Sequence, residues 1–223
     1  KYKAVKKKRK KRKPIKNTPK DFCGAIFLGS LAGGCLVSQN GMNTMLKKEI
    51  LISQWLTALF SFSIGLVCVF LLASFHKPKW EDFIPRLRKA KWICFTGGLL
   101  GPVYVVGAVY LTKVLTFTIF QNCAVCGMII SSSYCDSVGL LGVEVRSPSN
   151  SRIFWLFSLI ILILFSIYRE KSYHIGNGIF LVHCFCAMIA GSVFPLQACV
   201  NASLKHYVGT SYRASFVSFT CGV

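Results

Sequence analysis

Residues 32–47 read AGGCLVSQNGMNTMLK, and residues 190–205 read AGSVFPLQACVNASLK. Both stretches follow the pattern A-G-x5-Q-x3-N-x2-L-K. The likeness continues downstream, where Ser61-Phe62-x-x-Gly65 recurs as Ser218-Phe219-x-x-Gly222. Because a long motif that recurs within one chain indicates internal duplication, we interpret the sequence as two copies of one unit, the second starting near Gly178.

The composition is that of a membrane protein. Hydrophobic residues make up 53% of the chain and the mean hydropathy is +0.54, which is more than a soluble domain usually carries. The eleven cysteines lie mostly in apolar stretches, where cysteine packs as a small apolar residue, so we expect no disulfide. Neither Cys123-x-x-Cys126 nor His183-Cys184-Phe185-Cys186 has a second matched pair at ligand spacing. We therefore expect no metal and no cofactor.

Seven apolar segments have, or nearly have, the roughly 20 residues that a helix needs to cross a bilayer. The fold class we predict is an all-α polytopic membrane protein with inverted repeats of five transmembrane helices. Residues 1–21 form a basic disordered tail, residues 22–168 the first repeat, and residues 178–223 the first two helices of the second. The predicted spans are Phe22–Leu46, Ile52–Phe75, Trp92–Thr112, Val114–Cys135, Ile153–Tyr168, Gly178–Leu204 and Tyr207–Val223.

The charges are segregated between the spans. Of the 27 lysines and arginines, twelve lie in the first twenty residues, and most of the others lie between apolar segments. With the tail inside, twenty-two cations fall on the inner side and five on the outer side, so the positive-inside rule predicts a cytoplasmic N-terminus. The expected partners are the lipid bilayer and, at the basic tail, anionic lipid. We expect no nucleic acid, and the sequence leaves open a homodimer.

The predicted number of spans has a mechanistic consequence. A unit of five spans is odd, so its second copy must cross the membrane in the opposite direction. Inverted repeats give two interchangeable half-structures, and exchange of their conformations opens a central cavity to one side and then to the other. Because the chain begins with Lys1 and stops inside an apolar run at Val223, we expect the second repeat to be truncated.

Amide side chains recur within the apolar segments. On a helix, Gln39 and Asn43 share a face with their apolar neighbours, and Gln197 and Asn201 form the matching stripe. Buried amides need partners, so these side chains should face the bundle interior or a wet cavity. They either line a substrate pathway or hydrogen-bond between helices. The predicted pathway residues are Gln39, Asn43, Gln121, Gln197 and Asn201.

Small residues and one loop motif suggest structural roles. Glycines at helical spacing let membrane helices approach closely, and a proline inside a helix removes a donor and introduces a kink. We predict packing or hinge roles for Gly33, Gly65, Gly97, Gly101 and Pro102. The motif Asp136-x-x-Gly139-Leu-Leu-Gly142 follows the fourth span, and a turn or cap role is favoured over a cation or proton role.

Together these motifs resemble the YdcZ-like family of inner-membrane exporters, which belongs to the drug/metabolite transporter superfamily. The resemblance extends from Phe22 to Tyr168 and again from Gly178 onward. The family's Gly-Gln before the Asp motif is replaced here by Gly127-Met128. The motifs that carry the resemblance are Gln39-x-x-x-Asn43-x-x-Leu46, Phe60-Ser-Phe-Ser-Ile-Gly65, Gly97-Gly-Leu-Leu-Gly-Pro-Val-Tyr-Val-Val106 and Asp136-Ser-Val-Gly-Leu-Leu-Gly142.

The resemblance implies a transporter of small molecules or metabolites, and the duplication favours alternating access. No phosphate-binding loop, serine elbow or zinc-protease motif is present. We therefore expect that the protein is not an enzyme. The alternative function is a non-transporting membrane scaffold or receptor-like protein that recruits partners through its polybasic tail. A channel would need a continuous polar stripe through several spans, which the sequence lacks.

Overall fold

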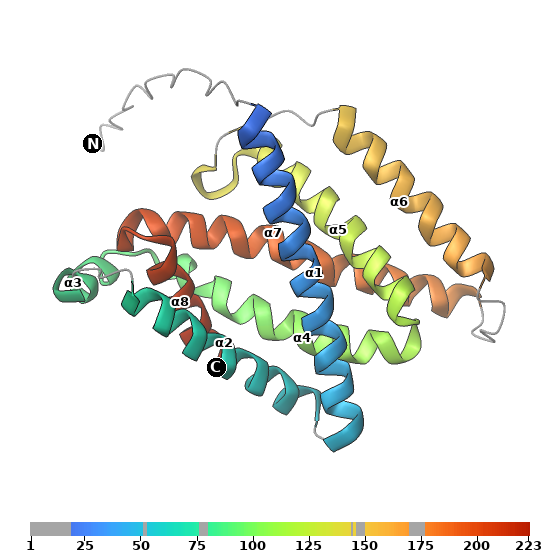
Figure 1. The fold of residues 1–223 in the computed structure, drawn as a ribbon, viewed down its shortest axis with the longest axis horizontal. Coiled ribbons are helices and arrows are strands. Elements are labelled where there is room, and N and C mark those ends of the chain that lie inside the picture. The colour runs from blue at the N-terminus through green and yellow to red at the C-terminus, as the bar shows by residue number, and fades with distance from the viewer. Residues whose placement is uncertain (1–18, 51–52, 76–79, 144, 146–149, 170–176) are drawn as a thin grey trace, which may run out of the picture. The chain divides into compact units, whose positions relative to one another are not determined.

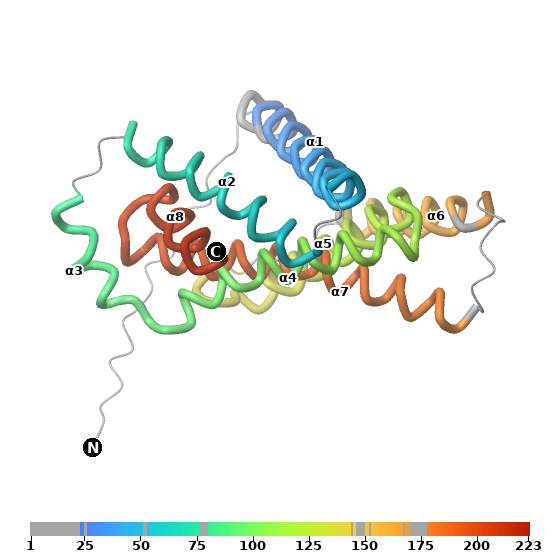
Figure 2. The backbone as a smooth tube through the Cα atoms, turned by 90° about the horizontal axis from the view of Figure 1, so that it is seen from below, coloured from blue at the N-terminus to red at the C-terminus, as the bar shows by residue number. Residues whose placement is uncertain are grey.

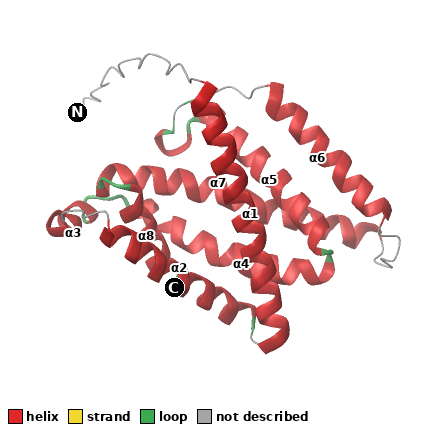
Figure 3. Cartoon of the chain, in the orientation of Figure 1, coloured by secondary structure: helices red, strands yellow, loops and turns green. Residues whose placement is uncertain are grey.

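The computed structural model describes residues 19–50, 53–75, 80–143, 145, 150–169 and 177–223. Within these ranges the regular structure is helical, and no strand occurs (Figure 3). Figure 1 gives the order of the helices along the chain. The long helices are α1 (Pro19–Ile50), α2 (Gln54–Phe75), α4 (Thr96–Val114), α5 (Phe117–Val138), α6 (Asn150–Arg169), α7 (Asn177–Val208) and α8 (Ser211–Gly222). The short ones are η1 (Trp80–Asp82), α3 (Phe83–Leu87), η2 (Trp92–Phe95) and η3 (Leu140–Gly142).

Each of the seven predicted spans coincides with one long helix. Three segments of the described chain are long and apolar enough to cross a membrane, namely Gln54–Phe75, Trp92–Val114 and Gly178–Val208, and Ile153–Ser166 is a shorter apolar helix. The helical prediction is therefore confirmed, while the number of crossings stays a prediction. The greater part of the predicted tail lies outside the described residues.

The helix ends differ from the predicted spans by a few residues at several places, of which two have a clear local reason. Helix α1 begins at Pro19, so residues 19–21, which we assigned to the disordered tail, are helical. Proline favours the first turn of a helix, because its fixed φ suits the helix and its missing N–H is not needed there. Helix α7 continues to Val208 and stops at Gly209, whose φ is +91°. Helix α8 then starts behind an N-cap at Thr210.

The chain divides into two compact units, residues 1–38 and residues 39–223, and the boundary lies within α1. In the second unit α7 packs against both α4 and α5, and the two views of Figures 1 and 2 show α5 beside α7. Helix α5 runs parallel to α7, because residues 124–127 meet residues 188–191, and further along both helices Ser131 Oγ donates to the Ser192 carbonyl at 3.0 Å. Helix α4 runs antiparallel to α7.

Two glycines allow the close approach of α5 and α7. A Cβ added at Gly127 would collide with the carbonyl oxygen of Met188, and one added at Gly191 would collide with that of Ala124. Each glycine therefore packs against the backbone of the other helix. Around this crossing lies a core of buried residues from α2, α4, α5 and α7, including Tyr104 and Phe120.

Candidate functional site

Equivalent hydrogen bonds occur in the two copies of the repeated motif. In the first copy Gln39 Nε2 donates to Ser61 Oγ at 3.0 Å, which joins α1 to α2. In the second copy Gln197 Nε2 donates to Ser218 Oγ at 3.4 Å, which joins α7 to α8. All four residues belong to the motifs that recur in the sequence. The shared glutamine and serine therefore make the same contact twice, between the first and second helices of each copy.

Asparagines extend the polar contacts of the first copy. Asn43 is 6% exposed, and its Nδ2 donates to the same Ser61 Oγ at 3.4 Å. Asn40 is 2% exposed and donates from Nδ2 to the Tyr104 hydroxyl of α4 at 2.7 Å. Sequence reasoning missed Asn40, because the equivalent position of the second copy is Ala198 and the repeated pattern passes over it. The sequence feature that could have identified Asn40 is an amide side chain within an apolar helix, because such a group needs a polar partner.

The other two predicted pathway residues lie apart from these bonds. Gln121 in α5 is 8% exposed, and among the described residues neither its Nε2 nor its Oε1 has a hydrogen-bond partner. Asn201 in α7 has a buried Oδ1 that likewise lacks a partner within the described part of the chain. A Cβ added at Gly97 would lie 3.2 Å from this Oδ1. Buried amide atoms without partners are rare in proteins, so both side chains require an explanation.

Aromatic rings and glycines of α2 and α8 pack reciprocally. The rings of Phe62 and Phe219 have centroids 5.3 Å apart. Phe62 fills the space beside Gly222, where an added Cβ would come within 2.7 Å of its ring, and Phe219 fills the space beside Gly65. These four residues are the two copies of the Ser-Phe-x-x-Gly motif. Each motif therefore packs its phenylalanine on the glycine of the other.

The five residues with predicted packing or hinge roles have different surroundings in the structure. Gly65, Gly97 and Gly101 all lie at close contacts, and the ring of Phe62 lies where a Cβ of Gly101 would be. Gly33 belongs to the separate unit of residues 1–38, so its packing stays a prediction. Pro102 lies inside α4, which is assigned as one helix from Thr96 to Val114. A hinge role for Pro102 therefore also stays a prediction.

The loop motif after α5 forms a helix stop. Gly139 has a φ of +68° and donates its backbone N–H to the Cys135 carbonyl, which is the usual left-handed C-cap. Gly142 has a φ of +92° in the following turn. Asp136 lies in the last turn of α5 and has an interaction of its own. The turn role predicted for this motif fits the two glycines, whereas a cation or proton role of Asp136 is untested.

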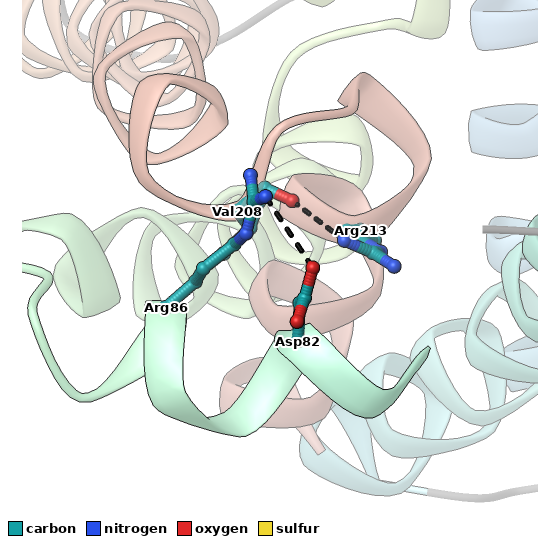
Figure 4. Close-up of polar contacts among 4 residues, drawn as sticks. All are labelled: Asp82, Arg86, Val208 and Arg213. Atoms are coloured by element: carbon teal, nitrogen blue, oxygen red, sulfur yellow. Dashed lines mark hydrogen bonds and ion pairs between the residues drawn. The ribbon is translucent and has the colours of Figure 1, made fainter. Parts of the chain in front are cut away.

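Sequence reasoning also missed a buried cation, Arg213, in the first turn of α8. It is 5% exposed, and its Nη1 donates to the Val208 carbonyl at 3.1 Å. Its guanidinium carbon lies 5.6 Å from the ring centroid of Trp80 and 5.7 Å from that of Phe83. Figure 4 shows this region, where Arg86 also pairs with Asp82 at 3.5 Å. Arg213 thus ties the α7–α8 turn to the segment between α2 and α4.

A groove with a volume of about 430 Å³ lies between α5 and α7. Its wall is almost entirely apolar, since Ser132 contributes the one hydroxyl among five apolar side chains. This volume is in the range of pockets that bind drug-sized molecules. The lining residues are Met128, Ile129 and Ser132 of α5 and Phe194, Pro195 and Ala198 of α7.

Comparison with known proteins identifies the family of this chain. A family model described as "Putative inner membrane exporter, YdcZ" matches residues 24–165 and 182–223. The chain belongs to this family. No curated protein and no solved structure matches. The two matched segments contain both copies of the repeated glutamine and asparagine, and together with the apolar helices they make this chain an integral membrane protein of an exporter family.

The contact between Asn40 and Tyr104 should stabilise the packing of residues 39–50 of α1 against α4. Replacing Tyr104 with phenylalanine keeps the ring but leaves the buried Asn40 Nδ2 without its acceptor. We expect the free energy of unfolding to fall by about 1–3 kcal/mol, measured by thermal unfolding in detergent. Tyr110→Phe is the matched control, since Tyr110 lies in the same helix and is 50% exposed. Equal stability of the two variants would show that the bond contributes nothing.

Proposed function

We propose that this protein exports small molecules or metabolites by alternating access between two inverted repeats. The first repeat comprises α1, α2, α4, α5 and α6, and α7 and α8 are the first two helices of the second. The N-terminus lies in the cytoplasm, in line with the distribution of the cations. The basic tail contacts anionic lipid of the inner leaflet. Membership of an exporter family favours transport over catalysis.

The observation that carries this proposal is the matched pair of Gln–Ser bonds. Each bond lies within one copy, Gln39 with Ser61 in the first and Gln197 with Ser218 in the second. The two bonds involve equivalent residues. The reciprocal packing of Phe62 and Phe219 on the two equivalent glycines supports it further. Contacts in which residue i meets j' while i' meets j are those of a local two-fold axis. An axis of this kind relates inverted repeats.

The directions of the helices agree with inverted copies. Asn40 meets Tyr104, and further along both helices Lys47 meets Lys113, so residues 39–50 of α1 run parallel to α4. Helix α7 runs antiparallel to α4, since Tyr104 packs on Phe194 while Gly97 lies beside Asn201. Residues 39–50 of α1 therefore run opposite to α7, which supports the proposed inversion of the second copy. Partial burial and the neighbouring Lys113 lower the pKa of Lys47 from its usual value.

The pathway in this proposal is lined by the repeated amides. Asn43 and Asn201 occupy equivalent positions, but Asn43 has a partner in Ser61, whereas Asn201 Oδ1 has none among the described residues. An exchange of conformations between the copies would exchange these two environments. Alternating access requires this kind of asymmetry between two copies of one unit.

The test is flux through the protein in liposomes. A panel of metabolites and drugs is screened for release that depends on the protein, and the Asn43→Leu/Asn201→Leu variant is compared with the wild type. We expect the double variant to lower flux by about tenfold, because two hydrogen-bonding groups worth about 0.5–1.5 kcal/mol each are lost. Size-exclusion chromatography checks that both proteins are folded.

A matched control is Asn150→Leu, since Asn150 is exposed at the start of α6. It should transport like the wild type. If the double variant folds and transports as well as this control, the assigned pathway is wrong. A wild type that moves nothing across a broad panel would favour the scaffold instead.

A further inference from the structure

Two lysine side chains from different helices contact one another where residues 39–50 of α1 pack on α4. Lys47 lies in the last turn of α1 and Lys113 in the last turn of α4, and the two side chains interact directly. Lys47 follows Asn40 by seven residues, so it lies on the face of α1 from which Asn40 reaches Tyr104 of α4. The packing of the two helices therefore brings these two cations together.

The two charges lack an acidic partner within the described part of the chain. Among the residues that the structure describes, neither Lys47 nor Lys113 pairs with an aspartate or a glutamate. A cation in the last turn of a helix complements the helix dipole, which accounts for each lysine taken by itself. It does not account for their contact, because two like charges at close range repel each other.

The surroundings of Lys47 favour loss of its proton. Partial burial and then the neighbouring Lys113 lower its pKa from the usual value. A bound anion would act in the opposite direction, since a nearby opposite charge favours the charged form of a lysine. An anion between the two ammonium groups would also relieve their repulsion, so the lysine pair has unmet capacity for a negative charge.

Aromatic residues indicate that this end of the helices lies at the membrane surface. Trp55 in the first turn of α2 is exposed, and so is Tyr110, which precedes Lys113 by three residues in α4. Tryptophan and tyrosine are enriched at the level of the lipid headgroups. The anionic group that phospholipid headgroups share at this level is phosphate.

We propose that Lys47 and Lys113 together form a binding site for a phosphate group, which lies between the two ammonium groups. Lysine binds phosphate as a point charge. Helix α5 begins at Phe117, four residues after Lys113, and the partial positive charge of its N-terminus adds to the site. The phosphodiester of a lipid headgroup and free inorganic phosphate share this chemistry. The site is separate from the proposed pathway, so it does not depend on transport.

The experiment measures how fast each lysine is acetylated in the full chain in maltoside micelles, at about pH 8. Acetic anhydride reacts with the neutral amine, and peptide mass spectrometry separates Lys47 and Lys113 from the exposed neighbour Lys48. Dihexanoyl phosphatidylglycerol or inorganic phosphate should slow acetylation of Lys47 and Lys113 at least about threefold, because a bound phosphate keeps both amines protonated. Lys48 should keep its rate. Reading single lysines excludes any contribution of the basic tail.

The added compounds distinguish the source of the phosphate. Protection by phosphatidylglycerol alone supports a lipid site, protection by inorganic phosphate alone supports a site for a soluble anion, and protection by both supports a site that accepts either. Chloride keeps the ionic strength equal in all samples. Dihexanoylglycerol carries the same chains without phosphate and should protect neither lysine. Protection by this compound, equal protection of Lys48, or no protection by either phosphate would overturn the proposal.

Two matched substitutions test whether the lysines act as a pair. Lys113→Gln removes one of the two cations and should abolish the protection of Lys47. Lys48→Gln removes a neighbouring cation of α1 and should leave that protection unchanged. Lys113→Gln should also slow acetylation of Lys47 without phosphate, because one cause of its lowered pKa is removed. Equal protection of Lys47 in the two variants would refute the paired site.

Discussion

Replacing Gly191 with alanine is expected to lower the free energy of unfolding by about 3 kcal/mol or more. The added methyl group would collide with the carbonyl oxygen of Ala124 in α5. A backbone atom cannot rotate away as a flexible side chain can, so α5 and α7 would have to separate. Separation would also disturb Gly127, which packs on the Met188 carbonyl at the same crossing.

The measurement is thermal unfolding of the purified variant in detergent, and the control lies in the same helix. Gly178 has no atom within 4 Å of an added Cβ, so Gly178→Ala should leave stability unchanged or raise it by up to about 1 kcal/mol. Both variants add one methyl group to α7, and only the one at Gly191 meets the backbone of another helix. If they unfold at the same temperature, the close crossing of α5 and α7 is wrong.

Replacing Arg213 with alanine is expected to have the second largest effect, a loss of about 3 kcal/mol. The guanidinium lies over Trp80 and Phe83 and donates to the Val208 carbonyl. Both rings and this carbonyl would lose a contact that is shielded from water. Arg213→Lys should restore part of the loss, since lysine keeps the charge but not the planar group that stacks on rings.

Thermal unfolding again gives the measurement, with Arg88→Ala as the control. Arg88 is exposed in the same part of the protein, and substitution of an exposed residue usually changes stability by less than about 0.5 kcal/mol. Tryptophan fluorescence adds a local readout, because the Trp80 ring loses its cation in the variant. An Arg213→Ala protein as stable as Arg88→Ala would refute the stabilising role of this contact.

The sequence alone determined the helices and marked the equivalent residues of the two copies. Apolar stretches of bilayer length have few alternatives to a helix, because backbone groups in lipid must pair within their own segment. The recurring motif also marked Gln39 and Gln197 as equivalent, and both make the same bond to a serine of the next helix. Local composition and spacing carry this information, so it can be read without knowing how the helices pack.

The tertiary structure decided which residues meet across helices that are distant in sequence. Asn40 pairs with Tyr104, Arg213 lies over Trp80 and Phe83, and the groove combines residues of α5 and α7. None of these pairs is marked by spacing along the chain. Helix rotation and crossing are fixed by packing, through contacts such as those of Gly127 and Gly191 with the opposite backbone. A sequence pattern gives the face of a helix, and only the packed fold determines what that face contacts.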